Sequence, residues 1–156
     1  MLNDPSQSLE AANLNSVVSH AATIDNLIEP VAKLWCRSFG ISDTATIDRL
    51  KLAIEDEAHQ ALASGGLDRV QHRLDSAAEK IIREWFAYVL NRDIPSSGKY
   101  LAVLRLAFLD CNYESKWSSS FLLKDFCVQE LSAELQTMMI MPTPQANPRS
   151  MIRQAI

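Results

Sequence analysis

The most regular pattern of hydrophobic and polar positions lies in residues 67–90. Apolar residues recur there at steps of three or four, which average close to the 3.6-residue turn of an α-helix. Because the repeat does not keep a strict period of seven, we expect the helix to face a globular core and not a coiled-coil partner. This first strip is formed by Leu67, Val70, Leu74, Ala78, Ile81, Trp85 and Val89.

The second half of the same helix carries a further apolar strip beside the first. It consists of Ile82, Phe86 and Leu90. A helix with one strip packs against one neighbour, whereas a wider apolar surface needs more cover. This half of the helix is therefore predicted to touch more than one neighbouring helix.

The segment before it, residues 16–39, also has one apolar helical face. Pro30 interrupts this face, and a proline inside a helix removes a backbone donor and crowds the preceding turn. The segment is therefore expected to be a kinked helix or two helices that abut near Glu29. Gly40 follows in the usual position after a helix end.

The next helix is expected to begin at Ser42 or Asp43, since either side chain can accept a hydrogen bond from a free backbone amide. The pair Gly65 and Gly66 ends it and allows a tight reversal. We therefore predict that this helix and the helix of residues 67–90 form an antiparallel hairpin.

Two more helices are predicted after the hairpin. Residues 99–111 are apolar nearly all round, with Arg105 as the only charge between Lys99 and Asp110, and their excess of Leu and Ala over β-branched residues favours a buried helix over a strand. A fifth helix follows Ser115 and runs to about Met139, with Trp117 and Phe121 on its core face.

These segments predict an all-α, single-domain bundle of about five helices with a central antiparallel helical hairpin and flexible termini. Residues 15–141 would form the bundle. Residues 1–14 are polar and read as a flexible N-terminal arm, and residues 142–156 as a Pro-containing C-terminal tail.

Composition and motifs narrow the classes of function. A chain of 156 residues with 47% hydrophobic content can fill one core, and a net charge of -4 argues against nucleic acid as the main partner. There is no secretory leader and no membrane-length apolar stretch, and the three cysteines form no CxxC pair, so a cytoplasmic protein is expected. The four glycines permit no G-x-S-x-G nucleophile motif, which favours a protein that is not an enzyme but leaves the question open, and we expect no cofactor.

The histidines raise an alternative. His59 lies six residues before Gly65 and His72 six residues after Gly66, so an antiparallel hairpin would bring them to the same level. Imidazole and carboxylate groups between two helices are the ligands of di-metal bundle sites. Since the flanks that carry them adjoin exposed faces, a solvated mixture of charges is the simpler interpretation. The alternative metal site would consist of Glu55, His59, Asp68, His72, Asp75 and Glu79.

The chain offers more apolar helical surface than one strip per helix requires. Surplus that a single core cannot absorb tends to be covered by a partner. We therefore predict a protein-interaction or regulatory adaptor module that binds another protein and self-associates as a homo-oligomer. The predicted partner-binding residues are Ile82, Phe86, Leu90, Met138, Met139 and Met141.

Two other functions stay open at this point. One is the metal-binding bundle that would use the histidines. The other is a small-molecule pocket between helices near Trp85 and Phe86.

Overall fold

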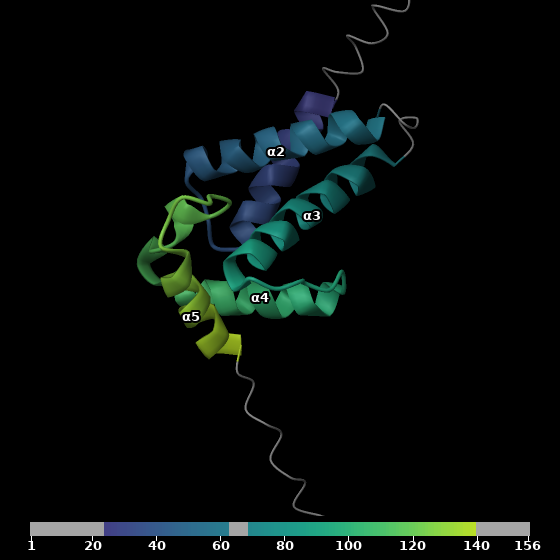
Figure 1. The fold of residues 1–156 in the computed structure, drawn as a ribbon. Coiled ribbons are helices and arrows are strands. Elements are labelled where there is room, and N and C mark those ends of the chain that lie inside the picture. Colours follow the sequence, from purple (N-terminus) through teal and green to yellow (C-terminus); the bar gives the residue numbers. More distant parts are fainter. Residues whose placement is uncertain (1–23, 63–68, 140–156) are drawn as a thin grey trace, which may run out of the picture.

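The computed structural model describes residues 24–62 and 69–139, and within those ranges the chain is helical and contains no strand. The predicted all-α bundle of five helices is confirmed (Figure 1). The expected flexible segments, 1–14 and 142–156, lie outside the described residues. The elements are a helix over residues 24–38, α2 (Thr44–Leu62), α3 (Val70–Leu90), α4 (Gly98–Cys111), the short 3-10 turns η1 (Tyr113–Ser115) and η2 (Ser118–Ser120), and α5 (Val128–Met139).

The first described helix is continuous across Pro30, which excludes the alternative of two helices that abut near Glu29. Pro30 lies on the exposed face, where water can reach the carbonyl that the proline leaves without a donor. The helix ends as predicted at Gly40, which has a positive φ of 73°. The amide of Ile41 donates to the carbonyl of Cys36 at 2.9 Å, so the turn satisfies a carbonyl at the helix end.

The antiparallel hairpin of α2 and α3 is also present (Figure 1). Asp43 caps α2, because its Oδ2 accepts a hydrogen bond from the amide of Thr46 at 2.9 Å. Along α2 the predicted apolar face is buried at Ile47, Leu50 and Ile54.

The C-terminal half of α3 is the most enclosed part of the hairpin. Both of its apolar strips lie in the core, Ile81 only partly. Asn91 ends the helix in the left-handed conformation, and the amide of Arg92 donates to the carbonyl of Ala87 at 3.1 Å. Residues 91–97 then connect α3 to α4.

The predicted fifth helix is wrong in its first half. Residues 113–127 form the turns η1 and η2 and an irregular stretch, and only Val128–Met139 are helical. Glu114, Ser115 and Leu122 have positive φ values, which a continuous right-handed helix does not allow. Serine-rich sequence favours such turns, because serine side chains compete for backbone groups.

Phe121, in this irregular segment, lies at the centre of the core. Its ring centroid is 4.9 Å from that of Trp85 on α3, 5.4 Å from Phe108 on α4 and 5.4 Å from Phe39, just after the first helix. The rings meet tilted or edge to face, which suits the aromatic quadrupole. Four parts of the chain are thus joined by one aromatic cluster, which also includes Phe86.

Side chains from α2 and α3 bind the backbone carbonyls of the irregular segment. Thr46 Oγ1 donates to the carbonyl of Ser118 at 3.0 Å, and Arg49 donates to that of Phe121 at 2.6 Å. Trp85 Nε1 donates to the carbonyl of Leu123 at 2.8 Å. Because an irregular segment has no ladder of its own, these donors replace the hydrogen bonds that a helix would have supplied.

We expect Gly40→Ala to lower the free energy of unfolding by about 1–2 kcal/mol. The positive φ disfavours a Cβ, and a Cβ built there would lie 3.0 Å from Leu109 Cδ2. Urea denaturation measures the change. Gly98→Ala is the matched control, because no atom lies within 4 Å of its Cβ position. Equal stability of the two variants would contradict the assignment of the turn.

We expect Thr46→Val to lower the free energy of unfolding by about 1–2 kcal/mol, since the shape is kept while the buried carbonyl of Ser118 loses its donor. Thr44→Val, at an exposed position on the same helix, is the control and should change stability by less than about 0.5 kcal/mol. Thermal or urea unfolding distinguishes them. An equally small effect of both substitutions would show that the bond does not hold the segment.

Candidate functional site

The side of α4 that faces away from the core carries a row of large apolar side chains. Leu106 is 60% exposed, Leu109 40% and Tyr113, just beyond the helix, 74%. Ala102, half-buried one turn before Leu106, extends the row. Steps of three and four residues place these positions along one line of a helix. We call Ala102, Leu106, Leu109 and Tyr113 the α4 stripe.

The opposite side of α4 is buried at Leu101, Leu104 and Phe108. The expectation of a fully buried helix therefore holds for one side only. A helix that is apolar all round is normally covered all round. No described part of the chain covers the α4 stripe in this way. An apolar helix is therefore exposed to solvent along one side.

A groove of about 340 Å³ lies beside the end of the stripe, between α4 and α5. Asp110 and Tyr113 line it from the α4 side, and Glu134 and Met138 from α5. Met138 is 51% exposed. The groove thus continues the apolar surface of the stripe towards the end of α5 and adds charged groups at its edge.

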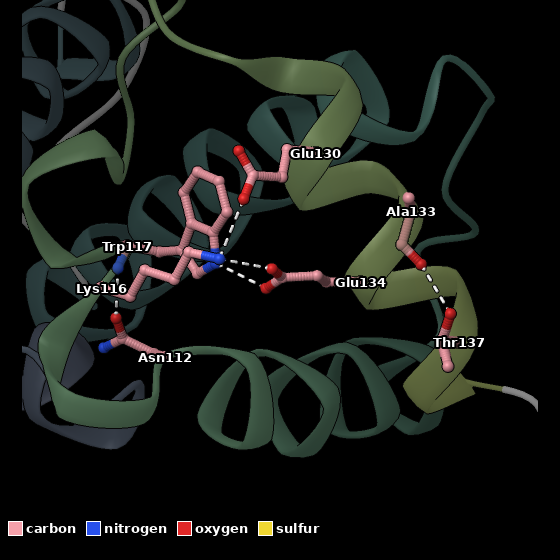
Figure 2. A network of polar contacts seen from close by, with 7 residues as sticks. All are labelled: Asn112, Lys116, Trp117, Glu130, Ala133, Glu134 and Thr137. Carbon is pink, nitrogen blue, oxygen red and sulfur yellow. Dashed lines mark hydrogen bonds and ion pairs between the residues drawn. The ribbon is translucent and has the colours of Figure 1, made fainter.

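Lys116 lines this groove and links the irregular segment to α5 (Figure 2). Its Nζ lies 2.6 Å from Glu134 Oε1 and 3.0 Å from Glu130 Oε1, so the irregular segment is tied to two successive turns of α5. Trp117 Nε1 donates to the other oxygen of Glu134 at 2.8 Å. The amide of Trp117 in turn donates to Asn112 Oδ1 at 2.7 Å.

These contacts shift the protonation equilibria of the groove. The hydrogen bond from Lys116 lowers the pKa of Glu134 below its usual 4.5, and Trp117 adds to this effect. The hydrogen bonds to Glu134 and Glu130 raise the pKa of Lys116. Both partners therefore stay charged near neutral pH. The described lining of the groove thus combines fixed charges with apolar side chains. This combination suits contact with the surface of another protein.

Two of the cysteines are unsuited to nucleophilic chemistry. Burial raises the pKa of the Cys36 thiol to about 12 and that of Cys111 to about 11, so both are thiols at neutral pH. Cys127 is exposed. All three cysteines are free, and the buried pair pack as small hydrophobic residues.

The residues of the alternative metal site are not brought together. His59 is exposed, and its Nδ1 lies 2.7 Å from the carbonyl of Glu55 on its own helix. Asp75 accepts a hydrogen bond from Trp35, and Glu79 pairs with Arg83. His72 is exposed, and Asp68 lies outside the described residues. Within the described ranges, no group of three His, Cys, Asp or Glu side chains could hold a metal ion.

The predicted partner-binding residues divide into two groups. Ile82, Phe86 and Leu90 are buried inside the single chain, and the ring of Phe86 contacts those of Phe39 and Phe108. This corrects their expected position at an interface. Met138 is exposed, Met139 is partly buried against the core, and Met141 lies outside the described residues.

The rings that were expected to line a small-molecule pocket fill the core instead. Trp85 and Phe86 are buried, with centroids 5.1 Å apart, and both contact Phe108. The space beside them is occupied by other aromatic rings. The helical spacing of Trp85 and Phe86 that suggested a pocket is the spacing of residues in the core.

The α4 stripe was missed because its residues were assigned to a buried helix. The signal was nevertheless present, since two apolar rows on opposite sides of one helix need two different covers. Comparison with known protein families, curated proteins and solved structures found no match to this chain. Among the described helices, none is long and apolar enough to cross a membrane.

We expect acid to destabilise the fold in part through Glu134. Its pKa in the folded state is below 4.5, so its contribution to stability is present above that pH and is lost as the pH falls through the lowered pKa. The free energy of unfolding should therefore fall less steeply between about pH 5 and pH 3 in Glu134→Gln than in the wild type. Asp56→Asn, an exposed position on α2, is the control. Identical slopes for the wild type and Glu134→Gln would contradict the role of the Lys116 contact.

Proposed function

We propose that the protein is a protein-interaction module that binds its partner through the α4 stripe and the adjoining groove. The observation that carries this proposal is the exposure of Leu106, Leu109 and Tyr113 on one line. Exposed apolar side chains scattered singly are ordinary, whereas a contiguous row on a soluble protein is typical of an interaction site. Self-association and a regulatory or adaptor role are part of this proposal.

The surroundings of the stripe fit a protein interface. Arg105 and Asp110 are exposed beside it, and Lys116 lies at the edge of the groove, so an apolar centre has a charged rim. Tyr113 adds a large side chain with few rotatable bonds, which costs little entropy when it is ordered. The buried face of α4 is held by the aromatic core, and the stripe is therefore presented on a rigid frame.

The free cysteines agree with a reducing compartment, and we propose a cytoplasmic protein on that basis. A role in metal binding has less support. His59 and His72 are exposed on their helices, and Asp75 and Glu79 have other partners.

A photo-crosslinking residue at position 106 tests the interaction in the native host. We expect it to give defined protein adducts, because a partner that covers the stripe would lie within reach of this side chain. The matched control is the same residue at position 52, since Leu52 is 62% exposed on α2 and lies outside the stripe. Adducts are separated by mass and identified by peptide sequencing.

Equal labelling at positions 106 and 52 would contradict the proposal, because it would show that the stripe meets only chance collisions. An adduct with the chain itself and an adduct with another protein would both support an interaction at the stripe. The first adduct would identify the partner as a second copy of this chain, and the second would identify it as a different protein.

A further inference from the structure

We infer that the partner on the α4 stripe is a second copy of this chain, with the two α4 helices packed side by side in parallel. The inference rests on the proposed function and adds the identity of the partner and the register. It is carried by the spacing of the stripe and by two charges beside it.

The spacing within the stripe suits a helix pair. Within α4, Ala102, Leu106 and Leu109 follow one another at steps of four and three, which is the alternation of the a and d positions in a heptad, and Tyr113 lies just beyond the helix end. In a parallel pair each of these positions meets its own equivalent. The stripe would then form successive layers, with Leu106 and Leu109 at the centre. Since the buried face of α4 lies opposite the stripe, the two cores would lie on the outer sides of the pair.

The flanking charges select the parallel orientation. Arg105 precedes Leu106 and Asp110 follows Leu109, so the helical turn places the two charges on opposite flanks of the stripe. They occupy g and e positions, and in a parallel pair a g residue faces the e residue five positions later on the other helix. Arg105 of each copy would therefore face Asp110 of the other, in two symmetric ion pairs.

An antiparallel pair of α4 helices would bring like charges onto the same side of the interface. Its two-fold axis puts the same flank of both helices on one side, so arginine would lie on the side of arginine and aspartate on the side of aspartate. Both charges are available in the single chain. Arg105 and Asp110 are exposed, and neither forms an ion pair with another residue of the described ranges. Lys116, the nearest cation in the groove, is held by Glu134 and Glu130.

The area of the contact sets the expected strength. One short stripe with two exposed ion pairs corresponds to a small interface, and small interfaces belong to weak and transient complexes. We therefore expect a dimer with a dissociation constant on the order of 10–100 µM. The protein would change between monomer and dimer within an accessible range of concentration.

Sedimentation equilibrium of the full chain, from about 5 µM to about 1 mM, tests self-association. We expect the mass to rise from monomer to dimer in the wild type and to stay that of a monomer in Leu106→Glu. Leu52→Glu is the control for the added charge at an equally exposed leucine and should dimerise normally. Circular dichroism checks that both variants are folded. A wild type that stays monomeric throughout would overturn the inference.

Charge reversal tests the register. Arg105→Glu and Asp110→Arg should each weaken the dimer about tenfold, because each creates two like-charge contacts. The double variant that exchanges the charges should recover most of the wild-type dissociation constant. An antiparallel dimer or a contact elsewhere predicts no recovery, and failure to recover would overturn the parallel register.

A cysteine at position 102 gives a second test of orientation. In a Cys127→Ser background the remaining native thiols are buried, so Ala102→Cys supplies the reactive group. A parallel pair brings the two new thiols together, and mild oxidation should give a covalent dimer. An antiparallel pair would separate them by about eleven residues of helix, roughly 16 Å, which no disulfide spans. Absence of the covalent dimer in a sample that sediments as a dimer would overturn the inference.

The failure of this inference is distinct from failure of the proposed function. A purified chain that stays monomeric, while position 106 crosslinks to a different protein, would remove the second copy and leave the interaction module. A stripe covered by residues 140–156 of the same chain is a competing outcome. Dimerisation that appears only after these residues are deleted would show that they cover the stripe, and would also overturn the inference for the intact protein.

Discussion

The burial of Phe121 among the rings of Phe39, Trp85 and Phe108 is the contact on which the rest of the fold depends. The four residues come from four different parts of the chain, so the loss of any one part leaves a void beside the others. Burial of one phenylalanine side chain stabilises a fold by roughly 1.5–3 kcal/mol, and removing its ring costs more because the cavity persists. The helices are thus connected through a residue that belongs to none of them.

Placing such a residue in the core requires an unusual supply of hydrogen bonds. The irregular segment enters the interior with carbonyls that no helix satisfies, and long side chains from distant helices supply the donors. Arg49 and Trp85 act in this way, each about 40 to 70 positions away from its acceptor. The conformation of the segment therefore depends on α2 and α3 as well as on its own serine-rich sequence.

Local periodicity accordingly predicted the helices well and the irregular segment badly. The apolar faces of α2 and α3, the glycine turn at residue 40 and the cap at Asp43 all follow from local rules, and all are present. Trp117 and Phe121 have helical spacing, yet tertiary hydrogen bonds override it. For the candidate site, periodicity located apolar strips but could not say which strip the core would cover. Which strip is buried depends on how the helices pack against one another. The apolar strips of a single helix carry no information about that packing.

The close approach of Gly40 to Leu109 links the turn after the first helix to the candidate surface. Leu109 belongs to the stripe, and its inner methyl group rests against the turn after the first helix. A larger residue at position 40 would have to displace that leucine, and so would alter a partner's contact surface without touching the partner. Selection on this surface could then act on an exposed glycine that is not itself part of the stripe. A survey of variants that considered only the α4 stripe would overlook the residue against which Leu109 is positioned.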